Sequence, residues 1–283
     1  MKIIVTGAKG QIGVDVIKEL TMREIEHKGV DLDDFDITNR YDVFNYLLDY
    51  QPDAVIHCAA YTAVDKAEDE PELCRFINEE GSRNIALACK EIDTKMIYIS
   101  TDYVFGGDGE DFYKPDDPKT PTCVYGVTKL AGEKAVMEIL DKYFILRISW
   151  VFGEHGNNFV KTMLRMGRER DELNVVCDQI GSPTYTADLA PLLYDMVVTD
   201  KYGIYHATNE GICSWAEFAQ NIFYQSGINV KVNPILASEY PVKARRPYNS
   251  RLDKSCLDEV GFKRLPCWED AIERLLKVRC LDC

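Results

Sequence analysis

A tyrosine and a lysine four positions apart equip this 283-residue chain for proton chemistry. Tyr125 and Lys129 form a Y-x-x-x-K pattern inside a stretch predicted to be helical, about Val124–Leu140. On a helix this spacing places both side chains on one face, so the ammonium can lie near the phenol. A free phenol, with a pKa of about 10, is a weak acid at neutral pH, and a nearby cation lowers that pKa. Such a pair suits the protonation of an alkoxide that forms when hydride attacks a carbonyl.

A hydroxyl group that could join this chemistry occurs earlier in the chain. Thr101 follows the apolar run Met96–Ser100, which is predicted to be a strand. Ligands of open α/β sheets bind at the carboxyl ends of the strands. We therefore predict Tyr125 as the acid, Lys129 as its tuning group and a ribose contact, and Thr101 as the group that polarises the carbonyl. A Y-x-x-x-K pattern also occurs by chance on exposed helix faces, so this assignment depends on a cofactor site elsewhere.

A glycine-rich turn supplies that site. The apolar run Lys2–Thr6 leads into Gly7, Gly10 and Gly13, and a helical stretch extends from about Gln11 to Met22. Glycines at these positions permit a tight reversal and a close approach of the backbone to a pyrophosphate. The helix N-terminus then offers free N–H groups and a partial positive charge. The turn predicts a dinucleotide, NADH or NADPH. The residues assigned to it here are Gly7, Gly10, Gln11 and Ile12.

The choice of coenzyme depends on the end of the second predicted strand, at Asp31. A carboxylate there accepts hydrogen bonds from the adenine ribose and repels a 2′-phosphate, and no Arg or Lys follows it directly. This favours NADH over NADPH, although Asp31 could instead be a solvated strand end. Asp36 and Ile37 are predicted to border the adenine. Ser100, Tyr125 and Lys129 complete the predicted cofactor contacts.

Strand and helix patterns alternate through the first half of the chain. Ala54–Cys58 and Tyr143–Ser149 are short apolar runs like Met96–Ser100, and Glu72–Glu91 carries apolar residues at helical spacing. This alternation predicts an α/β fold with a Rossmann-type doubly wound parallel sheet.

Beyond residue 152 the alternation loosens and turn residues become frequent. We therefore expect a smaller C-terminal substrate-binding lobe, with helices near Ser214–Ser226 and Trp268–Val278. The predicted division is an NAD(P)-binding domain at residues 1–152 with parts of 178–210, and a lobe largely at 153–283.

The composition of the chain argues against two classes of binding partner, nucleic acids and membranes. The formal net charge is −14, which opposes binding to nucleic acid, and no apolar run approaches the roughly 18 residues of a membrane helix. We expect a cytoplasmic protein without a nucleic-acid or membrane partner. The ten cysteines are scattered, as in reduced cytosolic proteins, and we interpret Cys280 and Cys283 as terminal thiols rather than a redox or metal pair. No metal site is predicted.

Segments along nearly the whole chain resemble one family, the dTDP-4-dehydrorhamnose reductases of the extended short-chain dehydrogenase/reductase superfamily. The segments are G-Q-I-G (Gly10–Gly13), A-A-Y-T-A-V-D-K-A-E (Ala59–Glu68), S-T-D-Y-V-F (Ser100–Phe105), Y-G-x-T-K-L-A-G-E (Tyr125–Glu133), S-W-V-F (Ser149–Phe152), G-N-N-F-V-K-T-M (Gly156–Met163), D-Q-x-G-x-P-T (Asp178–Thr184) and R-R-P-x-N-S-x-L (Arg245–Leu252). Those beyond the predicted sheet are more specific than the cofactor motifs.

The resemblance implies hydride transfer from NAD(P)H to the C4 keto group of dTDP-4-dehydro-L-rhamnose, giving dTDP-L-rhamnose for polysaccharide synthesis. It adds Ala59, Ala60 and Thr62 to the cofactor contacts. It places these residues around the sugar nucleotide: Val64, Thr101, Tyr103, Trp150, Asn158, Lys161, Arg246 and Asn249.

These residue types suit a sugar nucleotide. Arg246 and Lys161 would neutralise the pyrophosphate, and Trp150 would form a flat wall for the deoxysugar. The alternative is that Trp150 belongs to the core and that the two cations are solvated surface charges. Some relatives dimerise through magnesium, for which Asp15 is a candidate, but one carboxylate does not establish a metal site. We expect a monomer or a homodimer.

Three other functions fit these residues less well than simple reduction. A 4,6-dehydratase would carry an Asp-Glu pair after the strand-end threonine, whereas Asp102 is followed by Tyr103. An epimerase-reductase of the fucose-synthase type would carry a cysteine near Thr101, and Ser100–Asp102 has none. A non-catalytic NAD(P)-binding regulatory subunit, like the methionine adenosyltransferase beta subunit, would not need the intact Thr101, Tyr125 and Lys129. A different nucleotide-linked 4-keto sugar stays open as substrate.

Overall fold

A parallel sheet of six strands forms the larger part of the molecule. The structure is a computed structural model that describes residues 1–281, with side-chain surroundings described up to residue 278. The strands are β1 (Lys2–Thr6), β2 (Glu26–Val30), β3 (Ala54–His57), β4 (Lys95–Thr101), β5 (Tyr143–Ile148) and β10 (Gly203–His206). Their order is β10-β5-β4-β3-β1-β2, and each neighbouring pair is parallel. The predicted Rossmann-type doubly wound fold is confirmed.

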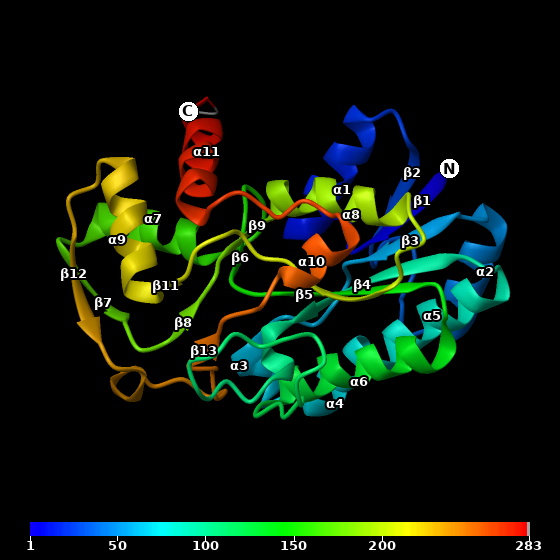
Figure 1. Cartoon of the computed structure of the whole chain (residues 1–283), viewed down its shortest axis with the longest axis horizontal. Coiled ribbons are helices and arrows are strands. Elements are labelled where there is room, and N and C mark those ends of the chain that lie inside the picture. Colours follow the sequence, from blue (N-terminus) through cyan, green and yellow to red (C-terminus); the bar gives the residue numbers. More distant parts are fainter. Residues whose placement is uncertain (282–283) are drawn as a thin grey trace.

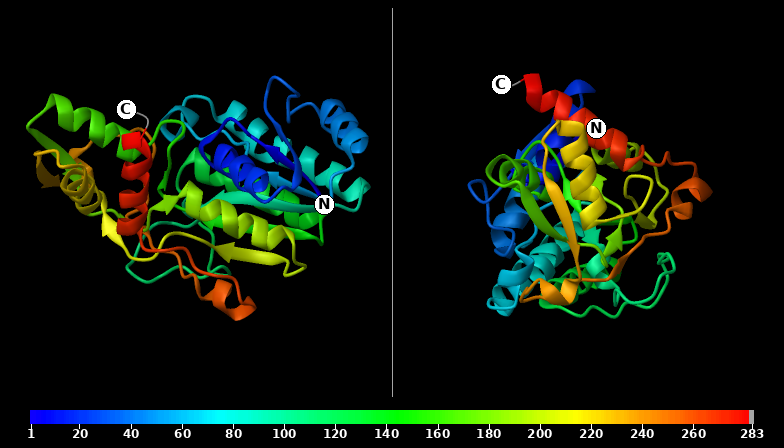
Figure 2. Two further views of the ribbon diagram at one scale, coloured as in Figure 1. Left: turned by 90° about the horizontal axis from the view of Figure 1, so that it is seen from above. Right: turned by 90° about the vertical axis from the view of Figure 1, so that its left-hand side faces the viewer.

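Helices cover both faces of this sheet (Figures 1 and 2). The helices are α1 (Gln11–Met22), α2 (Arg40–Tyr50), α5 (Ser82–Glu91), α6 (Val124–Ile139) and α8 (Thr186–Val197). Along β1, Ile3 and Val5 join the core beneath α1 and α8, whereas Ile4 joins the core beneath α2, α5 and α6. Successive strand residues point to opposite faces, so covering both faces buries the whole strand.

The predicted helix over Glu72–Glu91 is wrong as a single element. The chain forms α4 (Pro71–Arg75), a π-helical turn at Phe76–Gly81, and then α5. Gly81 faces Ile37, and a Cβ built on Gly81 would lie 2.7 Å from the Ile37 Cδ1 atom. Phe76 and Ile77 of this turn line the cleft described below.

A smaller lobe lies beside the carboxyl ends of the strands, at the left of Figure 1. Its helices are α7 (Phe159–Glu169), α9 (Trp215–Ser226) and α11 (Trp268–Leu281). Its strand pairs and small sheet comprise β6 (Val151–Phe152) with β9 (Thr184–Tyr185), β7 (Glu172–Val176) with β12 (Lys231–Ile235), and β11 (Cys213–Ser214), β8 (Ile180–Gly181) and β13 (Asn249–Ser250). Phe152, Phe218 and Trp268 lie in its aromatic core. The short helices α3 (Val64–Ala67) and α10 (Ser255–Val260) complete the elements used below.

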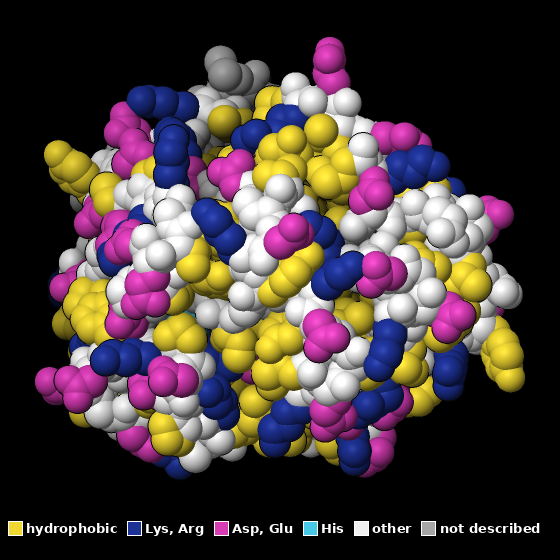
Figure 3. All heavy atoms as spheres, turned by 45° about the vertical axis from the view of Figure 1, so that its right-hand side comes forward, with side chains coloured by type: hydrophobic (Ala, Val, Ile, Leu, Met, Phe, Trp, Pro, Cys, Tyr) yellow, Lys and Arg dark blue, Asp and Glu magenta, His cyan; other side chains and the backbone are white. Residues whose placement is uncertain are grey.

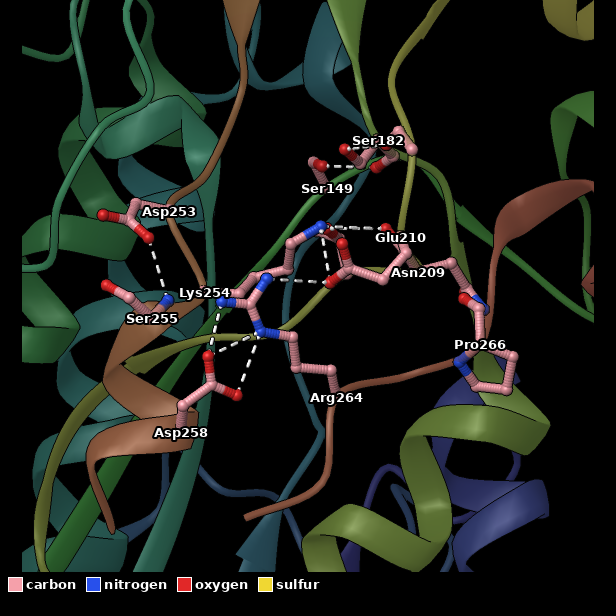
Figure 4. A network of polar contacts seen from close by, with 12 residues as sticks. Ser149, Ser182, Asn209, Glu210, Asp253, Lys254, Ser255, Asp258, Arg264 and Pro266 are labelled. Atoms are coloured by element: carbon pink, nitrogen blue, oxygen red, sulfur yellow. Dashed lines mark hydrogen bonds and ion pairs between the residues drawn. The ribbon is translucent and has the colours of Figure 1, made fainter. Parts of the chain in front are cut away.

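A polar network attaches the C-terminal segment to the rest of the chain (Figure 4). The buried Lys254 donates to the Asn209 carbonyl at 3.1 Å and pairs with Glu210 at 3.3 Å. Arg264 bridges Glu210 and Asp258. These bonds fix the path of the chain that leads from β13 through α10 to α11.

The surface carries charges of both signs. On the face shown in Figure 3, acidic and basic side chains are interspersed with apolar ones and neither sign gathers into one patch. Within the described residues, no helix combines the length and the apolar character needed to cross a membrane.

Candidate active site

A cleft of about 860 Å³ lies at the carboxyl ends of β1, β3, β4 and β5. It contains all the predicted cofactor residues and half of the predicted substrate residues. The predicted residues that line it are Gly7, Gly10, Gln11, Ile12, Asp31, Asp36, Ile37, Ala59, Ala60, Thr62, Val64, Ser100, Thr101, Tyr103, Tyr125, Lys129 and Trp150. Residues from distant parts of the sequence therefore meet in one space, as the strand-end argument predicts.

The glycine turn has the shape that a dinucleotide pyrophosphate requires. Gly7 has a positive φ of 65°, and a Cβ there would lie 2.7 Å from the Ala59 nitrogen. A Cβ on Gly13 would lie 2.2 Å from the Gly7 carbonyl oxygen. No side chain caps the N-terminus of α1 at Gly10, so its first N–H groups face the cleft without a side-chain partner. The residues present fit a dinucleotide.

Asp31 lines this cleft, and its carboxylate accepts hydrogen bonds from backbone nitrogens of neighbouring residues. Its carboxylate accepts from the Lys9 nitrogen at 3.0 Å and from the Leu32 nitrogen at 2.9 Å. Lys9 also lines the cleft, and its ammonium pairs with Asp33. Sequence reasoning missed Lys9, although a cation inside the glycine turn was a signal for a phosphate contact. Asp36 accepts from Thr38 and shapes the same loop.

Lys129 is buried beneath the cleft. Its ammonium donates to the Ile99 carbonyl at 2.8 Å and lies 4.0 Å from the centroid of the Tyr98 ring. Burial lowers the pKa of Lys129 to about 7, while the Glu133 carboxylate opposes that shift. The lysine is therefore close to its point of titration at neutral pH.

Tyr125 behaves differently from the prediction. Burial raises its pKa well above the ordinary value, and a hydrogen bond with the Thr101 side chain is the largest opposing influence. Burial of the phenol therefore dominates its pKa, and the lowering expected from Lys129, whose ammonium contacts the Ile99 carbonyl and the Tyr98 ring, stays a prediction. Tyr125 thus keeps its proton at neutral pH.

The hydroxyl of Thr101 is directed toward a carboxylate. It donates to Asp102 Oδ1 at 3.0 Å and accepts from the Tyr103 nitrogen at 3.2 Å. Asp102 is buried and lines the cleft. Sequence reasoning used Asp102 only to distinguish dehydratases and did not place it in the site, although an acidic residue directly after a strand end was a signal.

Ser100 connects the cleft to a buried ion pair. Its hydroxyl donates to Glu133 Oε1 at 2.5 Å. The same carboxylate accepts from Arg147 Nε at 2.8 Å and from another Arg147 nitrogen at 2.7 Å, and both charged side chains are fully buried. Ser100 therefore lines the cleft, while its hydroxyl is hydrogen-bonded to the buried Glu133.

Aromatic side chains form the substrate end of the cleft. Trp150 has a positive φ of 50° and stacks on Trp215 of α9, with ring centroids 3.7 Å apart. A non-glycine residue with positive φ is uncommon and marks a constrained position. Tyr103 contacts Tyr125 edge to face at 5.4 Å. Trp215, which supports the Trp150 wall, was not identified from the sequence.

Four predicted substrate residues do not line the cleft. Asn158 caps α7 and donates to Gln11 Oε1 at 2.9 Å, which joins the lobe to the glycine turn. Lys161 donates to the Gly156 carbonyl at 2.9 Å. Asn249 donates to the Asp111 carbonyl at 2.8 Å. Their assignment to substrate stays a prediction.

Arg246 is the fourth and is held by an acidic residue of α3. Its guanidinium donates to Asp65 Oδ2 at 2.7 Å and to Oδ1 at 3.3 Å. Asp65 also accepts from the backbone nitrogens of Lys243 and Ala244. This brings Arg246 next to Val64, which lines the cleft.

Asp15, the magnesium candidate, is buried and bonds to Thr186, and burial raises its pKa. Among the described residues, no three His, Cys, Asp or Glu side chains are grouped to hold a metal. Cys283 and the side chain of Cys280 lie outside the described part of the chain.

Comparisons with known proteins agree with this geometry. The chain matches the family described as "RmlD substrate binding domain" over residues 1–280. It is 40% identical to dTDP-4-dehydrorhamnose reductase of Aggregatibacter actinomycetemcomitans, over 97% of this chain and 98% of that protein. It is 39% identical to the spore coat polysaccharide biosynthesis protein SpsK of Bacillus subtilis (strain 168), over 100% and 99%.

A solved structure gives the same result. dTDP-4-dehydrorhamnose reductase from Bacillus anthracis str. Ames, in complex with NADP, is 44% identical with a TM-score of 0.96, over 98% of this chain and 99% of that one. The resemblance drawn from the sequence motifs is thereby confirmed, and the chain belongs to the RmlD family, that of the dTDP-4-dehydrorhamnose reductases.

Proposed function

We propose that this protein is an NAD(P)H-dependent reductase that converts dTDP-4-dehydro-L-rhamnose to dTDP-L-rhamnose. The observation that carries the proposal is the meeting of Thr101, Tyr125 and Lys129 in the cleft that the glycine turn enters. The bound nicotinamide would supply hydride to the C4 carbon. The phenol of Tyr125 would give its proton to the C4 oxygen, so that one C–H and one O–H bond form.

The electrostatics of the cleft suit that role. Burial keeps Tyr125 protonated between turnovers, so the acid is ready when the carbonyl oxygen becomes basic. After transfer, the phenolate needs a nearby positive charge, which Lys129 supplies in its protonated form. Thr101 lies within hydrogen-bonding contact of Tyr125, and its hydroxyl proton would turn from Asp102 to the phenolate oxygen to stabilise it.

The substrate would occupy the aromatic end of the cleft. Trp150 and Tyr103 offer flat apolar surfaces to a deoxysugar. Arg246 would leave Asp65 to contact the pyrophosphate, and Lys161, Asn158 and Asn249 would be further substrate contacts. The proposal includes the division into a cofactor domain, 1–152 with parts of 178–210, and a substrate lobe over most of 153–283. It also includes a cytoplasmic location and a monomeric or homodimeric state.

For the coenzyme we propose use of both NADH and NADPH. Asp31 favours NADH because its carboxylate repels a 2′-phosphate. Lys9 opposes that preference, since its ammonium lies at the same end of the cleft and is largely exposed. NADP binding by the Bacillus anthracis relative supports use of the phosphorylated coenzyme. Lys9→Ala should lower kcat/KM for NADPH more than for NADH, and equal losses would contradict this assignment.

The decisive experiment measures oxidation of NADH and NADPH with a panel of dTDP- and GDP-linked 4-keto sugars. Tyr125→Phe should lower kcat by about 10²- to 10⁴-fold with the coenzyme Kd unchanged, because only the acid is lost. Tyr224→Phe is the matched control, since Tyr224 is 85% exposed. Coenzyme binding without turnover of any sugar would refute the reductase and favour a regulatory subunit.

A further inference from the structure

Asp102 is a buried carboxylate that the proposed chemistry does not use. It follows β4 directly, is 3% exposed and lies at the wall of the cleft. A buried carboxylate is costly unless hydrogen bonds satisfy its oxygens. The partners that satisfy Asp102 therefore indicate what it does.

Those partners come from both parts of the molecule. Asp102 Oδ1 accepts from the Thr101 hydroxyl at 3.0 Å, and Oδ2 accepts from the Ser250 hydroxyl at 2.5 Å. Ser250 belongs to β13 of the lobe and packs against Gly181 of β8, which in turn packs against Trp150. One side chain thus joins the strand-end threonine to the strand that supports the substrate wall.

We propose that Asp102 is a positioning residue of this site: by accepting from Thr101 and Ser250 at once, its carboxylate holds the Thr101 hydroxyl against the Tyr125 phenol and ties it to the substrate lobe. The inference rests on the proposed reductase function. Thr101 is fixed from three sides, because its oxygen also meets the Tyr103 nitrogen and the phenol. A β-branched side chain is already restricted at χ1, and these contacts restrict it further.

The arrangement depends on the charge of Asp102. An ionised carboxylate only accepts hydrogen bonds, so it serves both hydroxyls. A protonated carboxyl, or the amide of Asp102→Asn, must donate from one of its two atoms and can then accept from only one hydroxyl. Burial raises the pKa of Asp102 to about 6, and the bonds from Ser250 and Thr101 oppose that rise. Below about pH 6, Asp102 therefore no longer accepts hydrogen bonds from both Thr101 and Ser250.

The titratable groups that face Asp102 do not titrate in this range. They are Tyr103 of its own turn, and Cys123 and Tyr125 at the start of α6; burial raises the pKa of each. Lys129 has a pKa of about 7, but it gains charge as the pH falls, so it governs the basic limb of a rate profile. We therefore expect Asp102 to govern the acidic limb of that profile, near pH 6.

The test is the pH profile of kcat for the whole protein and two variants. The wild type should lose rate below about pH 6. Asp102→Asn should lower kcat by about ten- to a hundredfold at all pH values and remove that limb, with the coenzyme Kd unchanged. Ser250→Ala should retain more of the rate and move the limb to higher pH, since the bond that lowers the Asp102 pKa is gone.

Ser182→Ala is the control for loss of a buried serine hydroxyl in the lobe, because the Ser182 hydroxyl donates to the backbone carbonyl of Gly211 and not to Asp102. It should leave the limb in place. The inference would be overturned if Asp102→Asn kept the kcat of the wild type together with the acidic limb of its pH profile. It would also be overturned if the acidic limb of Ser250→Ala stayed at the pH of the wild type.

A second measurement separates this inference from the reductase proposal. The folded state favours protonated Asp102, so its contribution to stability is present at low pH and lost as pH rises through about 6. Asp102→Asn lacks that loss, so its Tm should rise relative to wild type as the pH increases from about 4 to about 6, and the gain should stay constant above that range. If the wild type turns over no sugar, the reductase proposal is refuted. If the Tm of Asp102→Asn follows the same pH dependence as the Tm of the wild type, the inference that Asp102 is buried and hydrogen-bonded is refuted, whatever the activity.

Discussion

Replacement of Glu133 by glutamine should destabilise the fold severely. Glu133 and Arg147 form a bidentate pair in which both side chains are 0% exposed. The glutamate also accepts from Ser100. Its oxygens therefore receive three hydrogen bonds, and in Glu133→Gln one oxygen becomes an NH₂ group that faces an Arg147 donor. The guanidinium is left buried without a compensating charge.

The magnitude follows from that burial. Breaking a fully buried ion pair on one side costs about 3–5 kcal/mol of the free energy of unfolding. For a chain of this size each kcal/mol lowers Tm by about 2–4 °C, so Tm should fall by roughly 6–20 °C. Replacing both partners by apolar residues, as in Glu133→Leu with Arg147→Met, should cost less than the single change, because no charge remains unpaired.

Urea unfolding at pH 7, followed by tryptophan fluorescence, measures this difference. The matched control is Glu273→Gln, which removes one partner of an exposed pair with Lys277 and should change stability by no more than about 0.5 kcal/mol. A loss below about 1 kcal/mol for Glu133→Gln would refute the reasoning, since it would mean that water or a neighbour compensates Arg147.

The same variant should alter catalysis through Lys129. Glu133 raises the Lys129 pKa against the lowering by burial, so its loss moves that pKa further below about 7. The charged lysine is needed for the phenolate, and it is lost as pH rises through its pKa. The basic limb of the kcat profile should therefore move to lower pH in Glu133→Gln, and an unmoved limb would contradict the role given to Lys129.

Further predictions concern the substrate side and the packing. Arg246→Ala should raise KM for the sugar nucleotide with kcat largely kept; an unchanged KM would show that Arg246 does not reach the pyrophosphate. Trp215→Ala should also raise the KM for the sugar nucleotide without changing the coenzyme Kd, because Trp150 loses the ring on which it stacks. An unchanged KM would show that Trp215 does not support the Trp150 wall. Gly132→Ala should lower stability by about 1–3 kcal/mol in a urea titration, because the new Cβ would lie 2.3 Å from the Tyr98 hydroxyl; a neutral effect would mean that α6 shifts freely.

The sheet and the cofactor turn were predictable because their determinants are local. Buried parallel strands read as short apolar runs, and α1 begins and ends at the residues expected, Gln11 and Met22. Thr101 and Tyr125 could be brought together from sequence because parallel strands share one carboxyl edge. Conversely, the π-helical turn at Phe76–Gly81 was not predicted; Gly81 within it packs against Ile37, a residue about forty positions earlier that no periodicity within the helix reveals.

The side-chain partners could not be predicted for a related reason. Arg246 meets Asp65 across 181 positions of sequence, and Ser250 meets Asp102 across 148. Each contact is set by how the lobe folds back onto the cofactor domain, which residue types alone do not specify. Tyr125 was predicted as the acid, but the rise of its pKa was not, because burial of the phenol depends on packing that the helical spacing does not reveal.

The paired cations explain how an acidic protein can bind an acidic ligand. The chain has a net charge of −14, yet Lys9 and Arg246, the two cations proposed to contact ligand phosphates, each carry a carboxylate partner. In the proposed complex a phosphate would replace that partner, so the cation exchanges one anion for another instead of losing its water shell. The displaced carboxylates are accessible to water, since Asp33 is 79% exposed and Asp65 44%. Removing a carboxylate by Asp65→Asn should therefore tighten dTDP binding in a calorimetric titration, because Arg246 no longer has to leave an anion; weaker binding would show instead that Asp65 is needed to hold Arg246 in place.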